Sequence, residues 1–285
     1  MLDLLLLLMQ AVLELPPASQ GVIDGKQAVL IWPADQSGSL LDPAGCAVHM
    51  IPGDAQDEHL TYPCGRWFLP PRPQRYDFWL EQGNRISATQ TVLYYGGGPS
   101  KTGFLIADRI GPAGFVRVNA RPRAEETFRI ISLQSPGSGF ELSLKPAEID
   151  SNVRVPAGPT LCGIFDASGN AVALSPEIEV LGGKTATSTP VAPTPGTADL
   201  LVVLTRWGAE RPRGVQVRLQ QQTSSRAPDV FGETQSRVVA VWYGVPPGAY
   251  QTVITIGRND PVVLPASLSA DRVSTIRSMF PLAGK

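Results

Sequence analysis

Alternation of apolar and polar residues is the main pattern in this chain, and it predicts β-strands. In GVQVRLQQQ (214–222), Val215, Val217 and Leu219 share one side of an extended chain, and polar residues separate them. The segment YQTVITI (250–256) alternates less strictly. Because successive side chains of a strand point to opposite faces, such segments are typical of half-buried antiparallel strands. No helical pattern of useful length follows the first 20 residues, so the sequence predicts an all-β chain.

A cassette of strand, proline-rich corner and strand occurs three times. Residues 242–257 (WYGVPPGAYQTVITIG) and 67–83 (WFLPPRPQRYDFWLEQG) share an aromatic pair, a Pro-Pro corner, a tyrosine, apolar alternation and a terminal glycine, in that order. Proline presets φ and glycine permits φ > 0, and neither suits a central strand, so each Pro-Pro marks a tight corner. A weaker copy, VRVPAGPTLCGIF (153–165), leads into a hairpin at 166–170.

The copies divide the chain into three units, each of a normal size for a small β-sandwich. We place these domains at residues 21–111, 112–184 and 198–285. The segment TATSTPVAPTPGT (185–197) is rich in Pro and Thr and is predicted to be an extended, semi-rigid spacer.

The cassette resembles the carboxypeptidase regulatory-like domain, which has a G-x-x-V-x-L strand followed by (V/L)-P-P-G-x-Y-x-(V/L). Residues 199–285 match best, through Gly214, Val215, Val217, Leu219, Val245, Pro246, Pro247, Gly248 and Tyr250. Residues 21–111 match less closely, because Arg72-Pro73 stands where the family has glycine, and residues 112–184 match least. The resemblance implies tandem Ig-like or prealbumin-like antiparallel β-sandwich domains. It implies no activity, because this family is an accessory module beside enzymes, receptors and adhesins, and its peptidase relatives carry their zinc in a separate domain.

Residues 1–20 are predicted to be a signal peptide. The apolar run from Leu4 to Leu13 has the length of an h-region and is too short to span a bilayer, and turn-forming residues follow it. Asp3 stands where signal peptides carry Lys or Arg, so an apolar N-terminal helix docked on the core is the alternative. No cysteine follows the run closely. We therefore expect a periplasmic or extracellular protein without a lipid anchor or a membrane span in the mature chain.

The three cysteines suit an exported protein with one disulfide. A bridge between Cys46 and Cys64 would close a short loop and add about 3 kcal/mol of stability, leaving Cys162 as a buried thiol. Cys46, His49, His59 and Cys64 also have a spacing that invites zinc. However, residues three apart in a strand point to opposite faces, so Cys46 and His49 do not easily share a metal. We expect no metal and no cofactor.

Few residues are suited to catalysis or nucleic-acid binding. A formal net charge of −1 provides no basic field for nucleic acid or an anionic membrane. The segment 94–103 imitates a phosphate loop but is followed by no helix. The acidic loop around residues 54–58 and the turn at 166–170 lack the glutamate spacing of a calcium hand. No serine-hydrolase or zinc-protease motif is present, so we expect no enzyme activity; a hydrolase site around His49 and His59 is the remaining enzymatic alternative.

Aromatic residues are concentrated in the first predicted domain, which holds ten of the twenty in the chain. Alternation places Tyr76 and Phe78 on one face of a strand and Trp79 on the other, between Asp77 and Glu81. An outward tryptophan beside carboxylates is typical of a sugar-stacking platform or an anchor for a protein partner, whereas the alternative is that Trp79 packs under a loop. The candidate contact residues are Trp79, Asp77, Glu81 and Tyr95.

Together these features favour a non-catalytic, exported, multi-domain β-sandwich protein that serves as a structural or interaction module at the cell envelope. Its partner would be another envelope protein, bound through edge strands or loops. The alternative is a carbohydrate-binding protein that holds a polysaccharide on the exposed aromatics of its first domain.

Overall fold

The structure is a computed structural model that describes residues 22–53, 59–96, 104–133, 141–146, 149, 152–207, 214–234, 237–257 and 260–281. No α-helix occurs in these ranges, which confirms the predicted all-β class. Accordingly, the described part of the chain has no helix long and apolar enough to cross a membrane. The predicted signal peptide, the acidic loop and most of the glycine-rich segment lie outside the described residues.

The chain forms two compact units, Met1–Gly111 and Pro112–Lys285. The second unit contains the segments that the sequence analysis assigns to the second and third domains. The three-domain division itself stays a prediction, and each compact unit is described below by itself.

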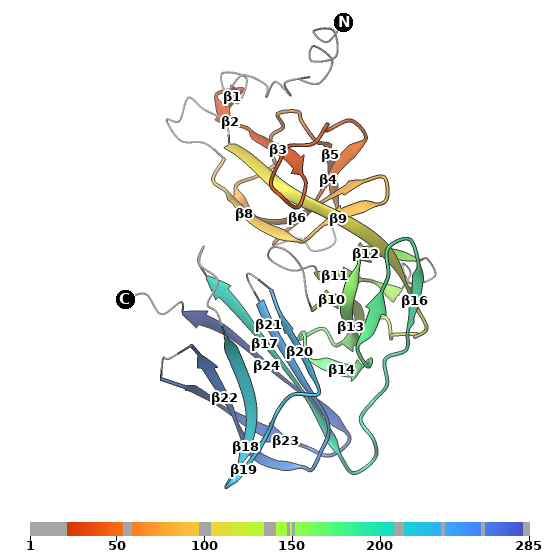
Figure 1. Cartoon of the computed structure of the whole chain (residues 1–285), viewed down its shortest axis with the longest axis vertical. Helices are drawn as coiled ribbons and strands as arrows, with labels where there is room; N and C mark the ends of the chain where they lie inside the picture. Colours follow the sequence, from red (N-terminus) through yellow and green to blue (C-terminus); the bar gives the residue numbers. More distant parts are fainter. Residues whose placement is uncertain are drawn as a thin grey trace, which may run out of the picture. The chain divides into compact units, whose positions relative to one another are not determined.

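The first unit packs two layers of strands around an apolar core (Figure 1). One layer pairs β3 (Val29–Ala34) in parallel with the first half of β9 (Phe104–Val118). The other contains, in antiparallel pairing, β5 (Leu60–Pro63), β4 (Cys46–Pro52), β6 (Gln74–Gln82), β7 (Arg85–Ser87) and β8 (Gln90–Tyr94). A small hairpin of β1 (Val22–Ile23) and β2 (Lys26–Gln27) precedes them.

The core of this unit confirms the predicted alternation in β6. Tyr76, Phe78 and Leu80 are fully or almost fully buried and point inward, and they pack with Val48 and Met50 of β4. Asp77, Trp79 and Glu81 consequently lie on the outer face of the same strand.

The second unit contains three successive sheets that share two apolar cores. The first sheet has β11 (Glu141–Leu144), β10 (Thr127–Ser132), β13 (Gly158–Phe165), β14 (Ala171–Leu174) and β15 (Ile178–Val180). The middle sheet has β20 (Val230–Glu233), β21 (Arg237–Val245), β17 (Ala198–Trp207) and β24 (Arg272–Pro281). The third has β19 (Ser224–Arg226), β18 (Val215–Gln221), β22 (Gly248–Ile256) and β23 (Val262–Leu268). In addition, β12 (Val153–Pro156) and β16 (Thr185–Ser188) pair with the second half of β9.

The middle sheet is buried on both faces. In β17, Leu200 and Val202 join the core shared with β18 and β22, whereas Leu201 and Val203 join the core shared with β10, β13 and β14. Residues of β21 divide between the two cores in the same way. The backbones also approach closely, because a Cβ added at Gly232 of β20 would lie 2.7 Å from the Leu133 side chain. The second and third repeats therefore share an apolar core.

The same strand order occurs three times along the chain. A first strand pairs in parallel with the last strand of its repeat, in β3–β9, β9–β16 and β17–β24. The strand after each proline corner pairs antiparallel with the second strand of the repeat, in β6–β4, β13–β10 and β22–β18. The last strand of the second repeat, β16, occupies the first four residues of the predicted spacer.

The proline corner is not a hairpin. β21 ends at Val245 and β22 begins at Gly248, but these strands belong to different sheets, so Pro246 and Pro247 carry the chain across the sandwich. Tyr250 donates a hydrogen bond of 2.9 Å to the carbonyl of Pro246. Tyr76 makes the equivalent bond of 2.8 Å to Arg72, also four residues back. The two sequence copies therefore form the same local structure.

Candidate functional site

The two histidines lie together against Trp79 on the outer face of the β4–β6 pair. His49 stands directly across from Trp79 in the strand register. Their ring centroids are 5.2 Å apart with an interplanar angle of 13°. The ring of His59, which precedes β5, lies 5.4 Å from that of Trp79. A hydrogen bond of 3.0 Å between His49 Nδ1 and His59 Nε2 closes this group, which we call the histidine–tryptophan cluster.

Glu81 extends the histidine–tryptophan cluster. Trp79 Nε1 donates to Glu81 Oε1 at 3.1 Å, and Glu81 Oε2 lies 3.9 Å from His49 Nε2. The bond between the imidazoles requires one unprotonated nitrogen as acceptor.

The expectation that Trp79 forms an exposed platform is wrong. The ring points outward, as alternation predicts, but only 4% of the residue is accessible because the two imidazoles lie against it. Asp77 forms an exposed ion pair of 3.1 Å with Arg75, which contributes little stability. Tyr95 is 78% exposed. A contact role for Asp77, Glu81 and Tyr95 stays a prediction.

We expect Trp79→Ala to lower the free energy of unfolding of the first unit by about 3 kcal/mol, because it empties a buried space beneath two rings. Tyr95→Ala is the matched control and should change stability by less than about 0.5 kcal/mol. Urea denaturation measures both. Equal, small effects of the two substitutions would show that Trp79 is not packed as described.

Cys46 and Cys64 form the predicted disulfide. Cys46 begins β4 and Cys64 follows β5, so the bridge ties the open ends of an antiparallel pair, with a Cα–Cα distance of 5.3 Å. Both cysteines are buried in the core of the first unit. Cys162 is the free thiol, and burial raises its pKa to about 12, which makes it unreactive.

Reduction of the disulfide is expected to lower the stability of the first unit by about 3 kcal/mol, because it frees a loop closed over 18 residues in sequence. The unfolding of residues 112–285 should be unaffected. The measurement is urea denaturation with and without a phosphine reductant. The Cys46→Ala/Cys64→Ala variant should have the stability of the reduced protein, and the reductant should not change it. If the reductant still lowered the stability of this variant, the Cys46–Cys64 disulfide would not explain the effect.

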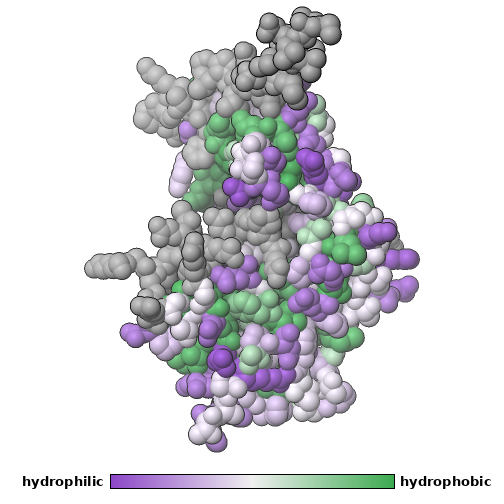
Figure 2. Space-filling view, in the orientation of Figure 1, coloured by the Kyte–Doolittle hydropathy of each residue, from purple (hydrophilic) through white to green (hydrophobic). Residues whose placement is uncertain are grey.

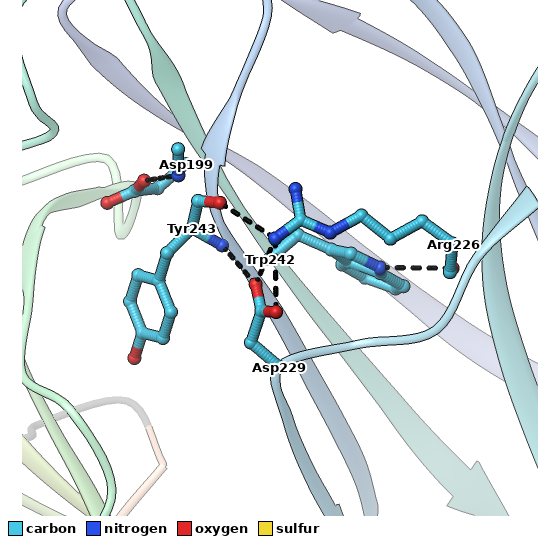
Figure 3. A network of polar contacts seen from close by, with 6 residues as sticks. Asp199, Arg226, Asp229, Trp242 and Tyr243 are labelled. Carbon is cyan, nitrogen blue, oxygen red and sulfur yellow. Dashed lines mark hydrogen bonds and ion pairs between the residues drawn. The ribbon is translucent and has the colours of Figure 1, made fainter.

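A second polar network lies in the second unit and holds its strands in place (Figure 3). Arg226 Nη2 contacts Asp229 at 2.7 Å and donates to the Tyr243 carbonyl at 3.1 Å. Asp229 in turn accepts from the Tyr243 amide at 2.8 Å. The indole of Trp242, buried in the core, donates to the Arg226 carbonyl at 3.3 Å.

The same network supports an irregularity in β21. The register with β17 shifts between Ala198 and Leu200, and Gly244 adopts φ +62°, which favours glycine. The Gly244 amide donates to Asp199 at 2.9 Å, and the Tyr243 hydroxyl donates to the Ser175 carbonyl at 2.5 Å. Burial raises the pKa of both Asp199 and Tyr243. Because these groups bind mainly backbone atoms, the network is structural.

No group of three or more His, Cys, Asp or Glu side chains suited to a metal occurs among the residues for which the structure gives positions. The turn at 166–170 is closed by its own bonds, with Asp166 Oδ1 accepting from the Asn170 amide at 2.9 Å. This is ordinary hairpin chemistry.

Comparison with known proteins finds only distant structural likenesses. No protein-family model matches the chain, and no curated protein matches it. A leucine-rich repeat protein from Bacteroides thetaiotaomicron is 10% identical, with a TM-score of 0.32, over 60% of this chain and 26% of that one. The TIE protein of Bacillus anthracis is 10% identical, with a TM-score of 0.21, over 90% and 51%. The Streptococcal ancillary pilin is 11% identical, with a TM-score of 0.18, over 89% and 98%.

These likenesses carry no argument about fold or function, because their TM-scores are low. The chain also spans only about a quarter and a half of the first two structures. The fold and the sites described above define a protein of tandem β-sandwich repeats.

Proposed function

We propose that this chain is an exported, non-catalytic module that binds a protein partner at the cell envelope, built from repeats related to the carboxypeptidase regulatory-like domain. The observation that carries the binding role is the exposure of three large apolar side chains in the first unit. Leu93 and Tyr95, on the same side of the end of β8, are 46% and 78% exposed, and Leu105 at the start of β9 is 47% exposed. Exposed aromatic and aliphatic side chains are typical partner contacts.

Figure 2 shows apolar surface, in green, on the visible face of the first unit. Export is supported by the Cys46–Cys64 disulfide, because such bridges persist in oxidising compartments. The non-catalytic role is supported by the polar network around Asp229 and Tyr243, whose hydrogen bonds connect strands. The kinship with the carboxypeptidase regulatory-like domain is supported by the equivalent tyrosine bonds of Tyr76 and Tyr250.

The test is photo-crosslinking in living cells from a reactive amino acid placed at Tyr95. We expect a reproducible crosslink to one envelope protein, and none from the same amino acid at Arg218, an exposed position of β18. Recovery of the chain from the cytosol with Cys46 and Cys64 reduced would contradict export. Absence of crosslinks from position 95 would contradict the binding role.

The carbohydrate alternative loses its platform because Trp79 is buried. Support for carbohydrate binding would be binding of the native chain to a glycan array, together with loss of that binding in Tyr95→Ala. That result would replace the proposed protein partner with a polysaccharide.

A further inference from the structure

Three arginines of the second unit surround a single carboxylate. Arg129 of β10 and Arg237 of β21 lie 3.5 Å and 2.7 Å from the two oxygens of Glu141. The guanidinium of Arg129 lies 4.7 Å from the centre of the Phe165 ring, and that of Arg277 of β24 lies 5.8 Å from it. Side chains from five strands of two packed sheets thus meet at one place, which we call the arginine cluster.

The charges of the arginine cluster do not balance. Burial alone would raise the pKa of Glu141, but Arg237, Arg129 and Arg277 together hold it below its ordinary value. Burial and the nearby Arg129 lower the pKa of Arg277, and Glu141 acts in the opposite direction. Among the described residues, three guanidinium groups face one carboxylate, which leaves an excess of two positive charges.

The cluster is also partly shielded from water while remaining accessible. The side chains of Arg129, Glu141 and Arg237 are 16%, 20% and 21% exposed, and Arg277 is exposed. Charges in such a setting are screened less than on an open surface, so an uncompensated excess attracts counter-charge more strongly. Arg129 and Arg237 are held by Glu141, and Phe165 supports the planes of Arg129 and Arg277, so the donors are ordered before any ligand arrives.

We propose that Arg129, Arg237 and Arg277 form a binding site for a dianionic oxyanion group of the sulfate or phosphate-monoester type. Such a group carries the two negative charges that the cluster lacks. Its tetrahedral oxygens match the planar, forked donors of guanidinium groups. The group can come from a free ion or from a polymer that carries it, and both share this chemistry.

The test is the stability of the full chain in sodium sulfate and in sodium phosphate, compared with sodium chloride at equal ionic strength. We expect both oxyanions to raise the melting temperature with a saturable dependence that chloride does not show. A sulfated heparin oligosaccharide forms a second arm; tighter binding than that of sulfate identifies a polymer-borne group, and equal or weaker binding a free ion.

Two variants of the arginine cluster have opposite expected effects. Arg277→Gln should weaken sulfate binding at least tenfold, while Arg272→Gln, an exposed arginine on the same strand, should leave it unchanged. Glu141→Gln should tighten binding several-fold, because it removes a competing carboxylate. The proposal is overturned if no oxyanion stabilises the chain beyond chloride, or if Arg272→Gln weakens binding as much as Arg277→Gln. None of these substitutions involves Tyr95. A negative result for oxyanion binding would therefore not count against the proposed partner contact at Tyr95.

Discussion

Replacing Leu201 with alanine is expected to lower the free energy of unfolding of residues 112–285 by about 3 kcal/mol. Leu201 has no accessible surface and lies on the face of β17 that packs against the first sheet of the second unit. If the second and third repeats were separate sandwiches, this face of β17 would meet solvent and the substitution would cost little. Urea denaturation followed by circular dichroism measures the change.

Leu200→Ala is the matched control for this experiment. Leu200 is equally buried, but it belongs to the core on the opposite face of the same strand. We expect a similar loss, in the same unfolding transition. A large effect at Leu200 together with an effect below about 0.5 kcal/mol at Leu201 would show that only one face of the middle sheet is buried.

Replacing Asp108 with asparagine is expected to stabilise the first unit by about 2–3 kcal/mol at pH 7 and hardly at all at pH 4. Asp108 is 6% exposed. Its Oδ1 accepts from the Arg109 amide at 2.9 Å, and its Oδ2 has no hydrogen-bond partner in the described structure. Burial raises its pKa to about 6, despite hydrogen bonds that act in the opposite direction.

The sign follows from the proton balance. The pKa of Asp108 is about 6 in the folded chain, and the ordinary aspartate pKa of about 3.9 applies to the unfolded chain. Between these two pH values the folded chain holds the Asp108 proton more tightly than the unfolded chain does. The stability that this carboxyl contributes is therefore complete below about pH 4 and is lost as the pH rises through 6. Asparagine stays neutral and keeps the amide acceptor, so it avoids that loss.

The measurement is the unfolding free energy of both proteins from pH 4 to pH 7. The difference in unfolding free energy between Asp108→Asn and the native chain should increase over this pH range and then become constant. Asp77→Asn, at an exposed carboxylate of the same unit, controls for the loss of a charge. Parallel pH curves for the native chain and Asp108→Asn would contradict the account.

Local patterns in the sequence predicted much of the fold. The alternation in residues 214–222 and 250–256 predicted β18 and β22, and the Pro-Pro corners predicted where strands end. The runs LLVVL (200–204) and VVAVW (238–242) do not alternate, which is typical of strands buried on both faces. These runs mark an extra apolar face on β17 and β21, and that face is where the second and third repeats meet.

The candidate site was harder to predict, because it depends on pairing between distant segments. Spacing alone suggested the Cys46–Cys64 bridge. The contact of His49 with Trp79 requires the β4–β6 register, and the burial of Trp79 also requires His59 to fold back over it. The arginine cluster combines side chains from strands of two sheets, so no local sequence motif predicts it. A one-strand pattern assigns a side chain to a face but does not say what covers that face.

The middle sheet of the second unit is buried on both faces and is shared by the second and third repeats. Native-state hydrogen exchange on the whole chain is the sharpest test of this arrangement. The slowest amides of β10 and β13 should exchange with the same free energy as those of β17 and β21, because all four strands open in one cooperative event. Exchange of β10 and β13 through a lower-energy opening that leaves β17 and β21 protected would show instead that the second repeat folds independently of the third.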